Sequence, residues 1–224
     1  MPNSILPITI LTLLFLMDIT VGLLGFEFTQ QYIGAAYFFF FYGYYRLLAI
    51  QRIILLEVAI FSQMIGYALF FNTTSPPVGI FLTSLTCLSL FLYTLLIHKC
   101  ISIKKKILFL LGPVFLIPYW IVLAYHLKEN LGDLAGIGII RKLIITYLMA
   151  VTVAFFAQKP SLKSATIFGA SFLVLINSIL SAYHFFGLVY IKYEITLTTL
   201  VSNYLIITFI VKNWKPDTQK EIII

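Results

Sequence analysis

Two acidic side chains lie within long apolar runs, where a charged group is costly. Asp18 stands about two-thirds along the run 5–25, and Glu57 stands one turn into the run 53–72. An ionisable residue inside an apolar span is a functional candidate by default, and a carboxyl group can act as a general acid or base. Structural alternatives stay open: a protonated, hydrogen-bonded Asp18, and a Glu57 that reaches water or pairs with Arg52.

The apolar run 165–187 carries five polar side chains that gather on one side of a helix: Ser171, Asn177, Ser178, Ser181 and His184. At 100° per residue, Asn177, Ser181 and His184 share one stripe, and Ser171 and Ser178 form the stripe beside it. Lipid cannot satisfy an amide, so this sector must face protein or a water-filled cavity. A lone His184 near the boundary is more often structural than catalytic.

Three other apolar runs carry small and polar residues on one helix face. These are Ala59, Ser62, Gln63 and Gly66 with Tyr67 beside Gln63; Thr83, Thr86 and Tyr93; and Thr198, Thr199, Ser202, Asn203 and Thr208. Such residues face neighbouring helices, because they permit close approach and hydrogen bonds. Plain helix packing explains these faces as well as a binding site does.

The composition determines which elements must position these residues. The 224 residues are 61% hydrophobic and 10% charged, with a mean hydropathy of +1.03, whereas soluble domains have about 25% charged residues. Lipid must therefore be the main solvent. The runs are continuous, without the alternation of barrel strands, so they predict helices. We expect residues 1–224 to form a single membrane domain.

We predict eight membrane-spanning helices, at about 5–25, 32–50, 53–72, 78–97, 107–125, 139–158, 165–187 and 190–211. Each is long enough for a ~30 Å hydrocarbon core. Pro113 and Pro118 interrupt the fifth. Of the 15 basic residues, 11 fall on the side of both termini and 4 on the other, which predicts that both termini are cytoplasmic.

Charge and histidine content narrow the function further. A net charge of +7 on a membrane protein indicates orientation and contact with anionic lipid, rather than binding to nucleic acid. Three dispersed histidines without a His-x-x-x-His spacing predict no metal site, and we expect no cofactor. Cys87 and Cys100 imply no disulfide framework.

Short motifs along residues 55–210 resemble a known family by their order and spacing. The segments "GASFLVLINSILSAYHFFG" and "TTLVSNYLIITFIVKNW" resemble the last two helices of the YhhN-type lysoplasmalogenase family. Gly169 and Ala170 match the start of its seventh helix, and the segment "TYLMAVTVAFFA" is similar to its sixth. Further matches are Ser62 with Gly66, Ser89 with Tyr93, and Asn203 with Leu205 and Ile206. Three positions depart from it: Tyr67 and Asn177 replace aspartates, and Leu90 replaces a histidine.

The resemblance implies a compact eight-helix enzyme of the bacterial inner membrane that hydrolyses the vinyl ether of a lysoplasmalogen. That reaction needs a general acid and a base, and an amide or an ordinary tyrosine is poor at either. The catalytic candidates are Asp18, Tyr67 and Asn177. The resemblance places Tyr67 and Asn177 where the family has aspartates, and Asp18, which lies outside the resembling segment, is the candidate acid because Glu57 lies off the Ser62–Gly66 face.

A polar cavity among the third, fourth, seventh and eighth helices would hold the lysophospholipid, on Ser62, Gly66, Tyr93, Ser178, Ser181, His184 and Asn203. The alternative is a non-catalytic lipid-binding or scaffold protein that kept the fold. A transporter is favoured less, because paired Gly/Pro-broken helices are missing.

Overall fold

The computed structural model describes residues 5–70, 76–104, 106–114, 116–118, 120–121, 135–185 and 192–215. Their regular elements are α1 (Ile5–Leu23), α2 (Glu27–Leu48), α3 (Ile54–Phe70), α4 (Pro76–Cys100), η1 (Lys106–Leu110), α6 (Ala135–Gln158), α7 (Leu162–Phe185) and α8 (Lys192–Asn213). Helical residues follow η1 as far as Ile121. No strand occurs in these ranges, which confirms the all-helical prediction.

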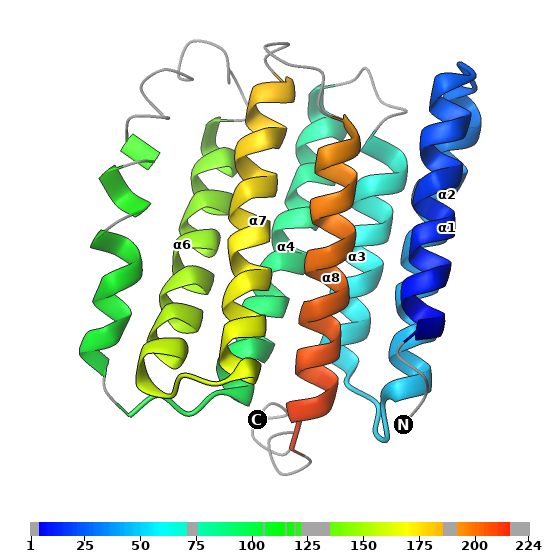
Figure 1. Cartoon of the computed structure of the whole chain (residues 1–224). Coiled ribbons are helices and arrows are strands. Elements are labelled where there is room, and N and C mark those ends of the chain that lie inside the picture. Colours follow the sequence, from blue (N-terminus) through cyan, green and yellow to red (C-terminus); the bar gives the residue numbers. More distant parts are fainter. Residues whose placement is uncertain are drawn as a thin grey trace.

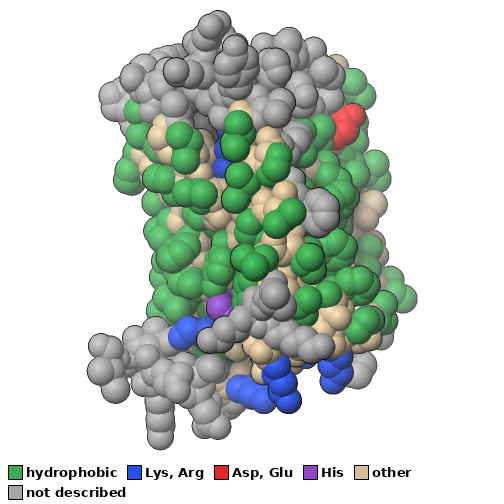
Figure 2. Space-filling model, turned by 90° about the vertical axis from the view of Figure 1, so that its left-hand side faces the viewer, with side chains coloured by type: hydrophobic (Ala, Val, Ile, Leu, Met, Phe, Trp, Pro, Cys, Tyr) green, Lys and Arg blue, Asp and Glu red, His purple; other side chains and the backbone are tan. Residues whose placement is uncertain are grey.

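Five of the helices are long and apolar enough to cross a membrane: α1, α4, α6, α7 and α8. Apolar side chains such as Leu16 and Leu143 are more than half exposed on them, as expected where lipid is the solvent. Figure 2 shows a band of hydrophobic side chains between the two ends of the bundle, with most of the visible Lys and Arg side chains below it. By these features the chain is an integral membrane protein.

From α1 to α4 and from α6 to α8, helices adjacent in sequence pack side by side, while η1 and α4 both pack on α6 (Figure 1). The helix α8 packs on α7 and also contacts α2 and α4, while α1 packs mainly on α2. The beginning of α1 and the end of α8 lie at the same end of the bundle (Figure 1). The eight membrane crossings and the sidedness of the termini stay predictions.

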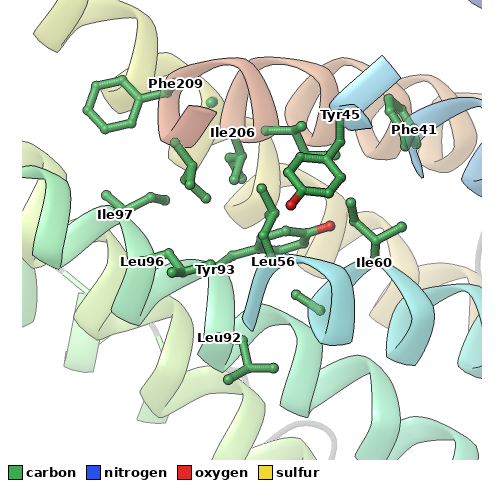
Figure 3. Packing of buried hydrophobic residues seen from close by; sticks show 14 of the residues in the cluster. Phe41, Tyr45, Leu56, Ile60, Leu92, Tyr93, Leu96, Ile97, Ile206 and Phe209 are labelled. Carbon is green, nitrogen blue, oxygen red and sulfur yellow. The ribbon is translucent and has the colours of Figure 1, made fainter. Parts of the chain in front are cut away.

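The main apolar core lies where α2, α3, α4 and α8 meet (Figure 3). Its largest fully buried side chains include Phe41, Tyr45, Leu56, Leu96 and Ile206. A second cluster surrounds Trp120, Ile145 and Leu175. The interior that surrounds the candidate site residues is therefore mostly apolar.

The fifth predicted helix begins as the tight 3-10 turn η1 rather than as an α-helix. Pro113 follows this turn, and a proline ring clashes with the carbonyl four residues earlier, here that of Phe109. The segment packs closely on α6: a Cβ added to Gly112 would lie 2.6 Å from the Cα of Ala150. Pro113 therefore accounts for the irregular start, and Gly112 for the close contact.

Candidate functional site

Asp18 is the exception on a helix that is otherwise exposed. Asp18 is only 5% exposed, whereas the other residues of α1 are partly or fully exposed. One turn earlier, the Tyr37 hydroxyl of α2 donates to the Leu14 carbonyl at 3.1 Å. Asp18 therefore lies on the side of α1 that faces the bundle, as predicted, in the part of the helix that lies against α2.

Asn177 is bound to the first turns of α8. Its Nδ2 lies 2.8 Å from the Ile195 carbonyl oxygen, 3.0 Å from Thr198 Oγ1 and 2.8 Å from Thr199 Oγ1. The amide thus donates to a cluster of three acceptors on the neighbouring helix. Within the bilayer, such a contact joins two helices because lipid offers no competing partner.

The remaining polar side chains of α7 follow the predicted sector only in part. Ser171 is buried and donates to the Ile167 carbonyl at 2.8 Å, and its neighbour Phe172 is 47% exposed. Ser178 and Ser181 are half-buried. The side chain of His184 lies outside the described residues.

The predicted polar face of α3 packs on α4. Ser62 is buried, and Gln63 Oε1 lies 3.5 Å from Ser89 Oγ. A Cβ added to Gly66 would lie 2.7 Å from Thr86 Cγ2 and 2.9 Å from the Leu82 carbonyl oxygen. Gly66 is therefore a contact point between two helices, as its spacing predicts. The side chain of Tyr67 lies outside the described residues.

Tyr93 and Asn203 lie in the interior rather than at an open surface. Tyr93 is buried within the main apolar core (Figure 3), with Ser89 as a hydrogen-bond partner. Asn203 is buried and donates to the Thr199 carbonyl at 2.8 Å, within its own helix. These contacts give both residues a structural role whether or not they also touch a ligand.

The three catalytic candidates are carried by helices that do not pack extensively on one another. α1 packs on α2, α3 packs on α2 and α4, and α7 packs on α6 and α8. The described side chains face different neighbours: Asn177 faces α8, and Asp18 lies in the α1 region beside α2. Packing accounts for Asn177, and its catalytic role stays a prediction, as do those of Asp18 and Tyr67.

Glu57 forms an electrostatic cluster with two arginines. Its Oε1 lies 3.2 Å from Arg46 Nη1, and its Oε2 lies 2.8 Å from Arg52 Nη2 and 2.8 Å from Arg52 Nε. The hydrogen bond to Glu57 raises the pKa of Arg52. The predicted Glu57–Arg52 pair is confirmed, and the boundary position explains why an acid is found in this run. Arg46 was missed because it comes from the preceding helix.

A second polar pair that the sequence did not indicate joins α4 to α6. The Tyr147 hydroxyl hydrogen-bonds to His98 Nδ1, and the His98 ring also contacts Phe109. Only the position of His98 in the last turn of α4 could have drawn attention to it. Within the described ranges, no group of three or more His, Cys, Asp or Glu side chains could hold a metal ion.

The described geometry therefore favours helix packing for most of the predicted polar residues and leaves Asp18 as a buried carboxyl group within an apolar helix.

In comparisons with known proteins, the chain matches no family model, no curated protein and no solved structure.

Proposed function

We propose that this integral membrane protein binds a membrane lipid, with a lysophospholipid as the candidate, and does not hydrolyse it. The observation that argues against hydrolysis, and so favours binding alone, is the environment of Asn177, whose amide donates to the α8 carbonyl and hydroxyls. An amide cannot supply a proton at neutral pH, and this one is committed to joining two helices. Glu57 is likewise committed to two arginines.

A divergent lysoplasmalogenase is the second candidate, favoured by the buried Asp18 within α1. In that reaction an acid protonates the vinyl ether carbon, and water adds to the neighbouring carbon. The resulting hemiacetal breaks into an aldehyde and the glycerophospho head group. Asp18 would be the acid, with Tyr67 and Asn177 lining the site.

We also propose that the chain crosses a bacterial inner membrane eight times, with the lysine-rich end and both termini in the cytoplasm. Most of the described Lys and Arg side chains gather at that end, whereas Arg141 and Lys142 of α6 do not. The positive-inside rule assigns the end richer in Lys and Arg to the cytoplasm. Reporter fusions at the two termini are expected to give the same sidedness, and opposite sides would contradict the eight-helix count.

The two functions are separated by an aldehyde-release assay. Purified protein in detergent is given a lysoplasmenyl lipid, and we expect no more aldehyde than from an empty-vector preparation, together with retention of intact lysolipid in native mass spectrometry. Release by the wild type that Asp18→Asn abolishes would overturn the binding proposal in favour of the enzyme.

Substitution of Asn177 provides a second arm of this assay. Asn177→Asp replaces the donor by an acceptor opposite three oxygens, so we expect a loss of about 1–3 kcal/mol in unfolding free energy and no hydrolysis. Asn213→Asp is the matched control, because the hydrogen bond that Asn213 makes among the described residues lies within the last turn of α8. Hydrolysis gained by Asn177→Asp with Tyr67→Asp would instead support a decayed enzyme.

A further inference from the structure

The lysine-rich end of the bundle holds a strong excess of positive charge. The described basic side chains at this end are Arg46, Arg52, Lys99, Lys104, Lys159, Lys163, Lys212 and Lys215, and all are exposed. Glu57 is the acidic side chain that the described residues place there, and both its oxygens are taken by Arg46 and Arg52. Among the described residues, the lysines from Lys99 to Lys212 have no acidic partner. The end therefore offers positive charge to an anion.

Three of these lysines come from helix ends that converge. Cys100 Sγ of α4 lies 3.9 Å from the Ile210 carbonyl oxygen of α8. Lys163, near the start of α7, places its Nζ 5.8 Å from the centroid of the ring of Phe209, which precedes Ile210 in α8. Lys163 thus lies at the end of α8, which carries Lys212 and contacts the end of α4, which carries Lys99.

The chain around this cluster is held by hydrogen bonds. Ser161 Oγ accepts from the Ser164 backbone N–H at 3.2 Å, and Ser164 Oγ donates to the Lys159 carbonyl at 2.8 Å. Gln158 accepts from the Lys104 N–H at 2.7 Å and donates to the Ser102 carbonyl at 3.2 Å. The turn before α7 and the segment after α4 are therefore fixed before any ligand arrives.

The same place is apolar on its outer side. Leu162, next to Lys163, is 87% exposed, and most of the Lys and Arg side chains visible in Figure 2 lie just below the hydrophobic band. A ligand that fills this position must present negative charge toward the lysines and hydrocarbon toward the band. An anionic phospholipid has both parts in that arrangement, and basic pockets between membrane helices bind such head groups.

We propose that Lys99, Lys163 and Lys212 form a binding site for the phosphate head group of an anionic phospholipid, at the converging ends of α4, α7 and α8. The site requires only that the protein spans a membrane. It is independent of the proposed lysolipid binding, which involves the polar faces inside the bundle.

The test is native mass spectrometry of the full chain in detergent, titrated with phosphatidylglycerol or with phosphatidylcholine. We expect tighter binding of phosphatidylglycerol. Each surface charge is worth roughly a fivefold change in affinity. Lys163→Gln should therefore weaken binding about fivefold, and the triple change Lys99→Gln, Lys163→Gln and Lys212→Gln should weaken it on the order of a hundredfold. Changing the same three residues to arginine keeps the charge and should keep the preference.

Two controls make the result specific. Lys142→Gln removes one charge from α6 outside this cluster and should leave phosphatidylglycerol binding unchanged. Lysolipid binding by the triple glutamine variant should also stay at the wild-type level. Failure of the lysolipid proposal can therefore be told apart from failure of the head-group site. Equal binding of the two phospholipids, or an anionic preference that survives the triple glutamine change, would overturn the site. Competition by inorganic phosphate as effective as by the lipid would assign it to free phosphate instead.

Discussion

Replacing Arg46 and Arg52 together by glutamine is expected to destabilise the protein more than replacing their shared partner Glu57. Glu57 is 4% exposed, whereas the two arginine side chains are 50% and 65% exposed. The double change leaves a buried carboxylate without a compensating charge, which costs about 3 kcal/mol, at the low end of the range for broken buried pairs because water reaches this site. Glu57→Gln leaves only exposed arginines, which water can solvate.

The measurement is the midpoint of thermal unfolding of each purified variant in the same detergent. Lys104→Gln with Lys159→Gln is the control, since it removes two exposed charges from the same end and should leave the midpoint nearly unchanged. Adding Glu57→Gln to the double arginine variant should restore part of the lost stability. A double arginine variant that melts with the lysine control would show that Glu57 does not need its partners.

The cluster also determines how the chain turns between α2 and α3. The Tyr45 hydroxyl accepts the backbone N–H of Ile53 at 2.7 Å, and both residues are buried. Arg46 follows Tyr45 in the chain, and Arg52 precedes Ile53. The hydrogen bond between Tyr45 and Ile53 therefore holds the two arginines near each other, on the two sides of the turn. The ion pairs and the tyrosine together hold the first turn of α3 against the last turn of α2.

The sequence predicts contacts well where local spacing decides them. Ala59, Ser62 and Gly66 share a face by helical geometry, and that face is buried against other helices. The pair of Arg52 and Glu57 is predictable because it is also local: the two residues are five positions apart in the chain. Arg46 joins this pair only through the turn between two helices, which the spacing of residues does not determine.

Asn177 shows the limit of prediction more clearly. Its helix face predicts a partner in the protein, but its acceptors are on Ile195, Thr198 and Thr199 of another helix. Which residues it meets depends on the rotation and height of α8 beside α7, and these come from the packing of both helices. The sequence alone therefore does not distinguish a catalytic role of the Asn177 amide from a role in helix packing.

Helix ends differ from prediction for identifiable reasons. α4 begins at Pro76 rather than at 78, because proline is tolerated in the first turn, where its missing N–H has no helical partner. α6 begins at Ala135 rather than at 139, so that its first turns include Gly136 and Gly138. Neighbouring helices can stabilise glycines that lower the helical propensity of an isolated segment.

Adding one methyl group at Gly112 is expected to destabilise the protein more than adding it at Gly66. The new Cβ at Gly112 would lie 2.6 Å from Cα, 2.8 Å from Cβ and 2.8 Å from N of Ala150. These atoms belong mainly to the α6 backbone and cannot rotate away, so the two segments must separate. At Gly66 the first obstacle is the Thr86 methyl group at 2.7 Å, which can turn, although the Leu82 carbonyl behind it cannot.

Overpacking of this kind costs about 1–3 kcal/mol, and we place Gly112→Ala at the upper end of that range. The helix propensity of alanine offsets roughly 0.5–1 kcal/mol at either position. Gly43→Ala and Gly169→Ala isolate that offset, because nothing lies within 4 Å of a Cβ at either glycine; both should be neutral or slightly stabilising.

Thermal unfolding of the four variants in one detergent gives the expected order, with Gly112→Ala least stable, then Gly66→Ala, then the two controls. If all four variants melted together, the glycines would act only through propensity. The predicted order instead follows from close approach, since helices inside a bilayer associate largely through packing, and a methyl group that separates two backbones removes the contacts along the whole interface.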